Sequence, residues 1–578
     1  MKKIPLSSTE RESSPRGQVE ILSKSQGELF DCAQIGISQA AQAAMDQAWL
    51  SKSGLPMLLL MEQAAASAFH FICQQILEQS AAAPEQYYLR RGEEKIEPAF
   101  LVFAGFGNNA GDAWALARQL RCISKNISVV DLAAGKNLSE DAERMRRSAK
   151  NLGLISVDLQ EVGQVENLYA SLVEEAPASI IIDGILGTGF DYRRGLSPVL
   201  RETIDLLNNL REAGATVLSL DLPSAVSADL GLIAETAVKA DYTLTFAFAK
   251  QGLFMRPAAS YAGQIKVLPM GIFTDPESLA EIPTKLRAIT PPILKNILPQ
   301  RREDSHKGCY GRVTIFAGSE KMPGALLLTA ESALRAGAGY VEIVSEQESA
   351  ELCLKYCPEV LLKTPLDLAA LTEQIARSSV IVAGPGWGRA DENYTYLPKL
   401  LASKARLILD ADALNIISEE YLPVERRLLL KARAEGASPG EIRTILSPHP
   451  GEFERLAPDL LEKYGDNVLK AVQTFAEESS AILLYKSSRS FFALPDGRTL
   501  VLPRSCPGLA RAGSGDVLSG LIAALWARGM AAEEALALAI YLHERTAEIL
   551  SADSSPDNMR VADLSRNFYR AVRELEQI

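Results

Sequence analysis

Short apolar runs alternate with helical stretches along almost the whole chain, and this alternation limits the possible folds more than any other feature. In the first half, the strand-like runs cover residues 100–105, 127–132, 179–183, 216–221, 242–248 and 265–268. In the second half, they cover residues 312–317, 340–344, 380–383, 407–410, 445–446 and 481–486. Strands separated by helices form βαβ units and mainly parallel sheets, whose ligands bind at the carboxyl ends of the strands. The sequence therefore predicts an α/β fold in both halves.

The length of 578 residues exceeds what one hydrophobic core usually supports, so two or more domains are expected. Helical patterning over residues 37–79 precedes the first series of strands. The segment 273–300 interrupts the alternation with five prolines, which is typical of a linker. We predict a loose N-terminal tail over residues 1–30, a first domain over 31–273, a linker over 274–300 and a second domain over 301–578.

Composition and charge exclude several classes of partner. The chain is 47% hydrophobic, 23% charged and 6% aromatic, as in ordinary soluble globular proteins, and its formal net charge is −12. Nucleic acids and anionic membranes require a concentrated positive field, so neither is expected as a partner. No apolar run reaches membrane-spanning length. Seven cysteines, an odd number, indicate reduced thiols and a cytoplasmic location, with Cys353 and Cys357 as small buried groups.

The stretch Gly513-Ser514-Gly515-Asp516 leads directly into an apolar helix and carries the strongest chemical signal. Its glycines allow backbone N–H groups to approach a phosphate, and the helix directs its positive N-terminal end to the same point. Asp516 stands where a proton must be removed from an attacking hydroxyl. The motif therefore indicates phosphoryl transfer. A glycine-rich helix start that serves only packing is the alternative, and it leaves Asp516 unexplained.

A second glycine-rich loop, Gly105-Phe106-Gly107-Asn108-Asn109-Ala110-Gly111-Asp112, follows the first predicted strand. It is similar to a dinucleotide-binding turn, and Asp131 ends the next strand at about the spacing of a ribose-binding acid. A hydride-transferring dehydrogenase is therefore one interpretation. A plain Rossmann turn, however, does not require two adjacent asparagines, whose amides offer oxygens to a cation and donors to a ligand.

Oxygen-bearing side chains follow three of the predicted strands in the first half. Asn109, Asp183 and Ser224 could converge on a hard cation, because amide, carboxylate and hydroxyl oxygens suit such ions. Each could instead cap the helix that follows it. Capping explains any one of them more easily than all three together.

Ordered motifs in both halves resemble one known family. The first half carries Leu60-Met61-Glu62-Gln63-Ala64-Ala65, the loop 105–112, Asp183-Gly184-Ile185-Leu186-Gly187-Thr188-Gly189 and Asp221-Leu222-Pro223-Ser224-Ala225. The second half carries motifs at residues 305–312, 318–325, 335–339, 384–388, 409–415, 447–452 and 513–516. The chain resembles the bifunctional NAD(P)H-hydrate repair enzymes. That resemblance implies an N-terminal epimerase domain with a Rossmann-like three-layer fold and a C-terminal ADP-dependent dehydratase domain with a ribokinase-like three-layer fold.

For the first domain, the resemblance implies that Asn109, Asp183 and Ser224 hold a potassium ion and that Asp221 is the principal catalytic acid or base. The hydrated nucleotide, NADHX or NADPHX, would contact Asn108, Asn109, Ala110, Gly111, Asp112, Gly187, Thr188, Gly189, Phe190, Asp191, Tyr192, Arg193 and Asp221. Alanine replaces a family glycine at positions 110, 113 and 225, and Gln63 replaces an asparagine. Each alanine adds carbon beside a loop that should approach a ligand closely.

For the second domain, the resemblance implies that Asp516 is catalytic and that Glu452 holds Mg²⁺ through water. The hydrate would contact Ala325, Gly386, Gly388, His449 and Asp516. ADP, a co-substrate, would contact Lys486, Ser487, Ser488, Arg489, Ser490, Gly513, Ser514 and Gly515. Within this region Ser487 and Arg511-Ala512 depart from the family pattern.

The resemblance implies an isomerase and a lyase in one chain, which epimerises the R and S hydrates and dehydrates the S form while ADP becomes AMP and phosphate. We also expect a homo-oligomer. Two other interpretations remain open: a ribokinase-like kinase of a small alcohol with a degenerate first domain, and a protein that binds without turnover. His449 between two prolines would alone suggest a rigid turn. His70 and His543 are expected to be structural or superficial.

Overall fold

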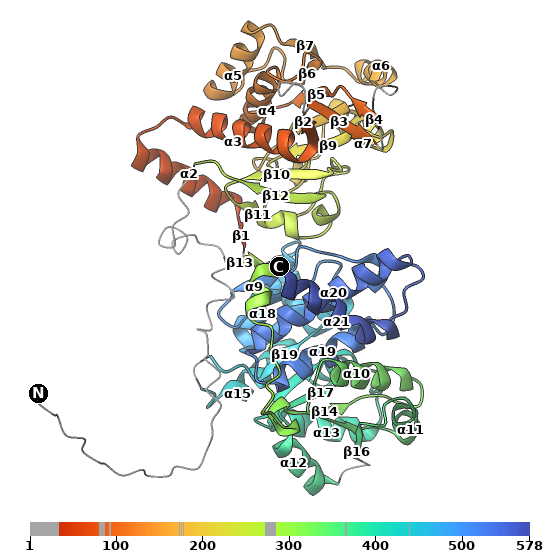
Figure 1. The fold of residues 1–578 in the computed structure, drawn as a ribbon. Coiled ribbons are helices and arrows are strands. Elements are labelled where there is room, and N and C mark those ends of the chain that lie inside the picture. The colour runs from red at the N-terminus through yellow and green to blue at the C-terminus, as the bar shows by residue number, and fades with distance from the viewer. Residues whose placement is uncertain are drawn as a thin grey trace, which may run out of the picture.

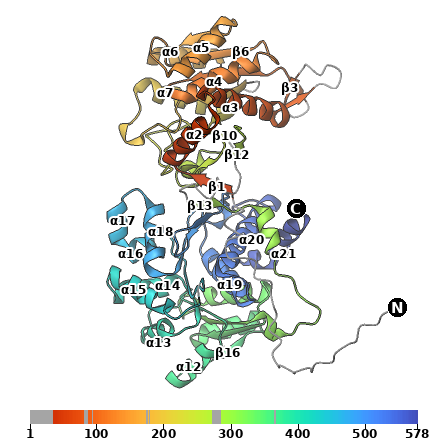
Figure 2. The same ribbon diagram turned by 90° about the vertical axis from the view of Figure 1, so that its left-hand side faces the viewer.

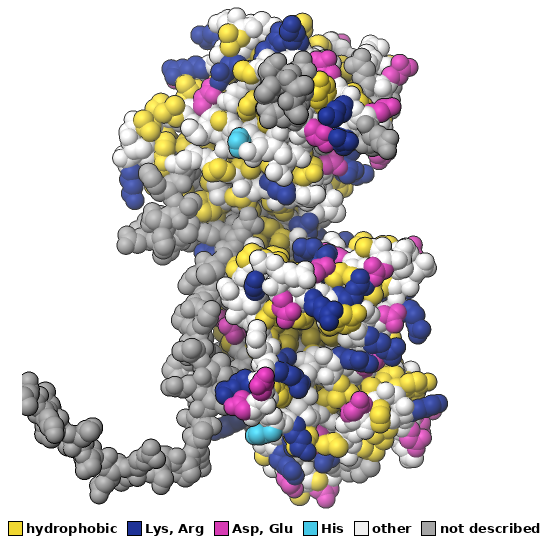
Figure 3. All heavy atoms as spheres, viewed as in Figure 1, with side chains coloured by type: hydrophobic (Ala, Val, Ile, Leu, Met, Phe, Trp, Pro, Cys, Tyr) yellow, Lys and Arg dark blue, Asp and Glu magenta, His cyan; other side chains and the backbone are white. Residues whose placement is uncertain are grey.

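The computed structural model describes residues 34–79, 87–91, 94–172, 174, 176, 179–271, 285–363, 367–438 and 440–578. The tail predicted over 1–30 lies outside these residues. Two lobes follow one another along the chain, an N-terminal lobe (residues 34–271) and a C-terminal lobe (residues 285–578) (Figure 1). On the face in Figure 3, basic and acidic side chains are interspersed over both lobes, with no broad basic patch among the residues drawn in colour.

A parallel sheet, of seven strands within the described residues, forms the centre of the N-terminal lobe. In spatial order, the strands are β12 (Gln264–Leu268), β10 (Tyr242–Phe246), β9 (Thr216–Leu220), β8 (Ser179–Gly184), β5 (Ala99–Ala104), β6 (Ile127–Asp131) and β7 (Ile155–Asp158). Every neighbouring pair is parallel. The six predicted strands are confirmed. The seventh, β7, lies at the sheet edge and is mostly exposed, so it lacks the apolar signal of the others.

Helices cover both faces of this sheet, because successive side chains of each strand point to opposite sides. Phe100 and Val102 of β5 pack toward one set of helices and Leu101 and Phe103 toward the other. The first set is α3 (Met57–Phe71), α4 (Gly107–Leu120) and α5 (Glu140–Asn151); the second is α6 (Val162–Leu172) and α7 (Pro198–Glu212). The predicted three-layer arrangement is confirmed.

The start of the described chain differs from the helical patterning predicted over 37–79. A strand, β1 (Gln34–Ile37), comes first, and α2 (Gln39–Ser53) ends at Gly54 in the left-handed conformation. After α3, the π-helix η1 (Ile72–Ile76) leads into β2 (Leu77–Gln79), which forms a small antiparallel sheet with β3 (Tyr87–Arg91) and β4 (Glu94–Ile96). No single helix of the described chain is long and apolar enough to cross a membrane, although residues 39–53 and 57–76 pass that test as a pair bent by 115°.

The central sheet of the C-terminal lobe is parallel over most of its width. Its strands from one edge are β16 (Leu361–Lys363), β15 (Tyr340–Val344), β14 (Arg312–Phe316), β17 (Val380–Ala383), β18 (Arg406–Leu409), β19 (Thr444–Leu446) and β20 (Ile482–Tyr485). Antiparallel β21 (Phe491–Ala493) and β22 (Thr499–Val501) follow. The six predicted strands are confirmed, whereas β16, β21 and β22 have only three residues each and were not predicted.

Two helical layers also enclose this second sheet (Figure 2). Val380 and Val382 of β17 face one layer and Ile381 faces the other. The first layer contains α10 (Pro323–Arg335), α19 (Ser514–Ala527), α20 (Ala532–Asp553) and α21 (Ala562–Gln577). The second contains α13 (Asp391–Ala402), α14 (Ala411–Glu420), α15 (Pro423–Ala434), α16 (Pro450–Leu456), α17 (Pro458–Tyr464) and α18 (Val468–Ser479). This half is therefore also a three-layer α/β fold, as predicted.

The linker predicted over 274–300 is wrong for its described part. Residues 272–284 lie outside the described residues, but β13 (Leu286–Ala288) joins the C-terminal sheet and α9 (Pro291–Asn296) packs into that lobe's core. Two of the prolines that suggested a linker, Pro291 and Pro292, occupy the first turn of α9, where a missing N–H costs nothing.

The C-terminal sheet continues into the N-terminal lobe. β13 pairs with β1, and β1 pairs with the two-residue strand β11 (Ala249–Lys250). The described sheet thereby reaches twelve strands, and its last two come from the N-terminal lobe. The lobes are therefore joined by backbone hydrogen bonds as well as by side-chain contacts.

Candidate functional sites

The N-terminal lobe contains a cavity of about 660 Å³ at the carboxyl ends of β5, β8 and β9. The sequence-predicted residues that line it are Asn108, Asn109, Asp112, Gly187, Thr188, Gly189, Phe190, Asp191 and Asp221. These loops come together because parallel strands end at the same edge of the sheet. Helix α2 closes the cavity with Gln39, Gln42 and Asp46, which were not predicted.

Four of the residues predicted to contact the hydrate are not among the described residues that line this cavity. Ala110 is buried inside α4, and a Cβ placed on Gly111 would lie 2.5 Å from the Met61 sulfur, so both face the lobe's core. Tyr192 and Arg193 point elsewhere. The Tyr192 hydroxyl donates a hydrogen bond to Asp466 of the C-terminal lobe (2.8 Å), and Arg193 Nε donates to the Tyr192 hydroxyl (3.1 Å).

The alanines that replace family glycines are accommodated away from the cavity. Ala113 fills the space beside Gly184, where an added Cβ would lie 2.5 Å from the Ala113 Cβ. Ala225 adopts φ of +72°, a left-handed conformation that costs a residue with a Cβ about 1 kcal/mol. The expected obstruction of the ligand loops is therefore not seen among these described residues.

Asp131, which suggested a dehydrogenase, is engaged in ion pairs. Its carboxylate lies 3.1 Å from Lys150 Nζ and 3.7 Å from an Arg146 guanidinium nitrogen, and the side chain is almost fully buried. A ribose hydroxyl would have to displace these partners. This geometry weighs against the dehydrogenase interpretation.

The three predicted cation ligands lie together, and one of them, Asn109, lines the cavity. The Asp183 carboxylate accepts hydrogen bonds from Ser219 Oγ (2.7 Å) and from the backbone N–H of Ser224 (2.9 Å). Asn109 Nδ2 donates to the Leu186 carbonyl (3.0 Å), and the backbone N–H of Leu186 donates to Ser224 Oγ (2.8 Å). Asn109 Oδ1 is buried and has no hydrogen-bond partner within the described chain. Since buried polar atoms are normally paired, this oxygen is available to a ligand.

Asp221 forms an ion pair that the sequence reasoning missed. Its backbone is in the left-handed region (φ +64°), and its carboxylate accepts a hydrogen bond from Lys250 Nζ. Lys250 is only 1% exposed and also donates to the Phe246 and Phe248 carbonyls, at 3.3 Å each. A single lysine inside the apolar stretch 242–254 was the available signal, because a buried charge requires a partner.

Two further carboxyl groups share the cavity with this pair. Burial raises the pKa of Asp112 well above its usual value; the Asp221 charge adds to the shift and Lys250 opposes it. Burial likewise raises the pKa of Asp46 on α2, while a hydrogen bond from Gln42 lowers it. The cavity therefore combines an ion-paired carboxylate with carboxyl groups that favour the protonated state.

The C-terminal lobe contains a second cavity, of about 780 Å³. It is lined by all the residues predicted to contact ADP together with His449, Glu452 and Asp516, namely His449, Glu452, Lys486, Ser487, Ser488, Arg489, Ser490, Gly513, Ser514, Gly515 and Asp516. Arg256, Ala259 and Ser260 of the N-terminal lobe also line it and were not predicted. The second site is thus completed by residues of the first lobe.

Asp516 lies in the first turn of α19. This helix begins directly after Gly513, whose φ is +92°. Burial raises the pKa of Asp516 to about 7, with a further contribution from the charge of Asp410, while Lys486 lowers it. A carboxylate with a pKa near neutrality is suited to accept a proton at physiological pH. The predicted role of Asp516 is compatible with this environment.

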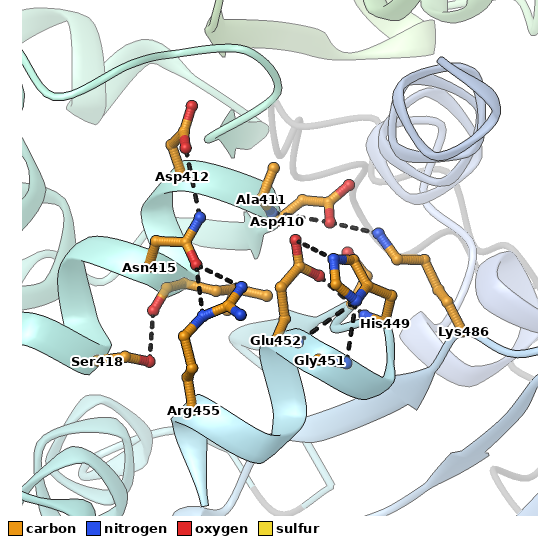
Figure 4. A network of polar contacts seen from close by, with 12 residues as sticks. Asp410, Ala411, Asp412, Asn415, Ser418, His449, Gly451, Glu452, Arg455 and Lys486 are labelled. Atoms are coloured by element: carbon orange, nitrogen blue, oxygen red, sulfur yellow. Dashed lines mark hydrogen bonds and ion pairs between the residues drawn. The ribbon is translucent and has the colours of Figure 1, made fainter. Parts of the chain in front are cut away.

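Lys486 is held in place by carboxylates (Figure 4). Its Nζ lies 2.5 Å from Asp410 Oδ1, and Asp410 Oδ2 accepts a hydrogen bond from Ser519 Oγ on α19 (2.7 Å). Burial alone would lower the pKa of Lys486, but the charges of Asp410 and Glu452 outweigh it and raise the pKa. Lys486 therefore remains a cation beside the start of α19.

His449 and Glu452 cap the first turn of α16 reciprocally (Figure 4). His449 Nδ1 accepts from the backbone N–H of Gly451 (3.1 Å) and of Glu452 (3.3 Å), and Glu452 Oε2 accepts from the His449 N–H (2.8 Å). Burial raises the pKa of Glu452, while Lys486 lowers it. His449 therefore both lies in a rigid turn and lines the cavity.

Ala325, Gly386 and Gly388 are not among the described residues that line this cavity. They form a separate cluster: a Cβ on Gly386 would lie 2.6 Å from the Ala325 Cβ, and the Gly388 N–H donates to Asp412 (2.8 Å). Asp412 connects the cluster to the site, since its charge contributes to the raised pKa of Asp516.

His543 was expected to be structural or superficial, and its burial excludes the second alternative. His543 is buried, but it lines the cavity beside Glu544, and burial lowers the pKa of His543 to about 4. Two adjacent polar residues within the apolar helix α20 were the available signal. His70 is exposed on α3, as expected of a superficial residue.

Comparisons with known proteins cover both lobes. A family model described as NAD(P)H-hydrate dehydratase matches residues 313–570, and one described as YjeF-related protein N-terminus matches residues 58–252. Bifunctional NAD(P)H-hydrate repair enzymes from Moorella thermoacetica and Thermofilum pendens are 30% and 31% identical, over 94% and 92% of this chain and 97% and 95% of theirs. The Escherichia coli enzyme is 28% identical over 82% of this chain and 85% of its own length.

Among solved structures, an ADP/ATP-dependent NAD(P)H-hydrate dehydratase from Bacillus subtilis is 26% identical, with a TM-score of 0.42, and covers 50% of this chain and 98% of its own. The matches to curated relatives extend over nearly the full length of both proteins and include both lobes. The two cavities contain most of the residues that the motifs singled out. The chain therefore belongs to the family of bifunctional NAD(P)H-hydrate repair enzymes.

Proposed function

We propose that the chain repairs the hydrated nucleotides NADHX and NADPHX, with one reaction in each lobe. The N-terminal lobe interconverts the R and S hydrates, and the C-terminal lobe converts the S form into NADH or NADPH while ADP becomes AMP and phosphate. The observation that carries this proposal is Asp516, which lines the C-terminal cavity at the start of α19 and has its pKa raised to about 7. Family membership supports the pairing of the two activities.

In the C-terminal cavity, Asp516 would accept the proton of the hydroxyl at C6 of the hydrate as that oxygen attacks the terminal phosphorus of ADP. The bond from this phosphorus to the AMP oxygen breaks, and the N–H groups at the start of α19 with Lys486 stabilise the transferred charge. The C6–O bond then breaks with phosphate as leaving group, assisted by the ring nitrogen's electron pair. Loss of a proton from C5 forms the C5–C6 double bond.

Glu452 fits the predicted role in holding Mg²⁺ through water. Its carboxylate lines the cavity, and burial raises its pKa, so a nearby cation would stabilise the charged form. When bound, the ion would neutralise charge on the nucleotide's phosphates. The protein's own part is to keep the Glu452 side chain in place through the reciprocal cap with His449.

In the N-terminal cavity, the pairing of Asp221 with Lys250 and the raised pKa of Asp112 support acid–base chemistry at C6. The protonated Asp112 can give a proton to the group that leaves C6, and the Asp221 carboxylate can take one from the group that adds to the other face. Lys250 holds the Asp221 side chain in place through their ion pair. One carboxyl group is thus paired with a cation and the other is buried beside it, and reversible opening and closing at one carbon can use both groups.

Potassium is the proposed cation of the N-terminal site. Asn109 Oδ1 is buried without a partner in the described chain, beside Asp183 and Ser224, and this oxygen donor set suits a hard cation. When bound, the ion would supply a fixed positive charge next to the cavity. Asn109, Asp183 and Ser224 would hold it, and their existing hydrogen bonds keep the side chains in position.

An equilibrated mixture of R and S hydrates tests both assignments in one assay. With ADP, the wild-type protein should restore all of the NADH absorbance and release equimolar AMP and phosphate. D221N should restore only the share present as the S form, and D516N should restore none while still interconverting the epimers on a chiral separation. Full restoration by D221N, or restoration by D516N, would contradict the assignment. A stable phosphorylated alcohol in place of NADH would instead support the small-alcohol kinase.

A further inference from the structure

One end of the C-terminal cavity contains two buried polar side chains that the proposed reaction does not use. His543 and Glu544 are adjacent on α20, are 6% and 5% exposed, and both line the cavity. His543 Nε2 and Glu544 Oε2 have no hydrogen-bond partner in the part of the chain that the structure describes. An unpaired buried polar atom is costly, so this pair is typical of a site whose partner is a ligand.

The surroundings of this pair suit a flat heterocycle. Pro507, Leu509 and Ala510 line the same cavity, and the short helix η7 (Pro507–Leu509) packs on α20. His543 also forms a hydrogen bond with the backbone of Ser514, so it adjoins the loop proposed to hold phosphate. An apolar wall with a few convergent polar groups is the usual lining of such sites.

Nearby cations do not neutralise Glu544. The Arg489 guanidinium donates to the carbonyls of Leu253 (3.2 Å) and Ala259 (2.9 Å), and Arg504 is paired with Glu548 (2.7 Å). Glu548 is also paired with Arg545, one position after Glu544. Burial raises the pKa of Glu544 well above its usual value, Glu548 adds to the shift, and Arg489 and Arg504 oppose it. The other titratable groups that line the cavity are neutral His543 and, at positions that the proposal does not use, Arg256, Asp410, His449, Glu452, Lys486, Cys506, Arg511 and Asp516.

A protonated carboxyl group offers an O–H donor beside a carbonyl acceptor, whereas a carboxylate offers acceptors only. Adenine offers an amino donor beside a ring-nitrogen acceptor, which matches the protonated form and not the carboxylate. We propose that Glu544, in its protonated form, binds the adenine base of the nucleotide in this cavity, with His543 alongside. This inference deepens the proposed function, since it rests on ADP being the nucleotide there.

Both ADP and the hydrate carry an adenine, and calorimetric titration distinguishes them. ADP and NADH are titrated separately into the intact protein, without hydrate, so no turnover is involved. E544A should weaken ADP binding about tenfold, the loss expected when a buried hydrogen-bonding partner is removed. E544Q, which keeps a donor and an acceptor, should bind ADP nearly as well as wild type. If NADH binding weakens in E544A and ADP binding does not, the adenine assignment to ADP is overturned.

The pH dependence separates this role from a merely structural one. As pH rises through the raised pKa of Glu544, wild-type affinity for ADP should fall because Glu544 loses its proton, and E544Q should bind with unchanged affinity. The matched control is E533Q: Glu533 is also buried on α20, with its pKa raised to about 7, but it lines a separate cavity. E533Q should retain the wild-type profile. Equal profiles for wild type and E544Q would overturn the inference while leaving the proposed reaction intact; failure of wild type to bind ADP would contradict both.

Discussion

At the scale of single residues, Asp516 shows how burial prepares a side chain for chemistry. Its pKa is raised to about 7, so below that pH it is protonated and cannot accept the proton of an attacking hydroxyl. We expect kcat/KM for dehydration to rise as pH increases through about 7 and then level off. The check is a pH profile measured with excess ADP, in which a flat profile from pH 5 to 9 would exclude Asp516 as the base.

Asp412 provides a control within the same charge network. Its negative charge contributes to the raised pKa of Asp516, so D412N should move the midpoint of the pH profile toward lower pH. Folding stability supplies an independent measurement. Because the folded pKa of Asp516 lies above its unfolded value, stability falls as pH rises through about 7, and D516N should remove this fall.

Residue patterns identified the motif residues of the two cavities more readily than the side chains that contact or accompany them. Motifs pointed to Asp221 and Asp516, because each follows a strand or begins a helix with a recognisable spacing. Lys250 and Glu544 could not be assigned in this way. A polar residue within an apolar stretch indicated that each is buried, but the partner of Lys250 lies far away in the sequence and the surroundings of Glu544 depend on the fold.

At the scale of elements, helix α19 contains one glycine near the proposed phosphate site, Gly515, and one in the core, Gly520. A Cβ on Gly515 would lie 3.3 Å from Lys486 Nζ, at the flexible end of a side chain, whereas one on Gly520 would lie 2.1 Å from the Thr329 carbonyl oxygen. G515A should keep wild-type stability to within about 1 kcal/mol, because alanine favours the helix. It should reduce dehydration at least tenfold, because the methyl group obstructs the phosphate.

G520A is the matched comparison on the same helix. The clash with backbone should destabilise the protein by about 1–3 kcal/mol without a specific loss of dehydratase turnover by the folded fraction. Denaturant unfolding and the absorbance assay, run on both variants, check the pair. If G515A destabilises as much as G520A and retains turnover, the start of α19 is not a phosphate site.

Most strands of four or more residues were predicted, and most of the shorter ones were not. Among the strands from β14 to β20, β16 and β19 have three residues each and the others have four or five. Most of them are continuous apolar runs. β13, β21 and β22 have three residues each, and β11 has two. Such strands are defined by pairing with distant segments, so their own sequences carry little signal. The short helix α9 also gave little signal of its own, so the prolines at its start suggested a linker.

At the scale of the whole molecule, the two reactions are connected by shared structure. Lys250, which pairs with Asp221 in the first cavity, lies on β11, the edge strand of the C-terminal sheet. The second cavity is lined in turn by Arg256, Ala259 and Ser260 of the N-terminal lobe. Neither connection follows from the sequence of one lobe alone. The motifs of each half indicated separate sites, whereas each described site depends on the junction between them.

Arg489 is the side chain on which this junction can be tested. It belongs to the loop that lines the second cavity, and its guanidinium donates to two carbonyls of the N-terminal lobe, those of Leu253 and Ala259. R489A leaves both carbonyls without their donor, and we expect a loss of about 2–3 kcal/mol in stability. The same change should raise the KM for ADP. Hydrogen exchange should increase in residues 251–260 and 487–490 together, because one contact holds both segments.

Tyr192 supplies the control for this experiment, because it crosses the same junction at an exposed position. Its hydroxyl donates to Asp466 at 2.8 Å, and Y192F removes only that bond. Exposed hydrogen bonds exchange readily with water, so Y192F should change stability by less than about 0.5 kcal/mol and leave the KM for ADP unchanged. If R489A behaves like Y192F, the Arg489 contact does not hold the junction, and the second cavity does not depend on that contact with the first lobe.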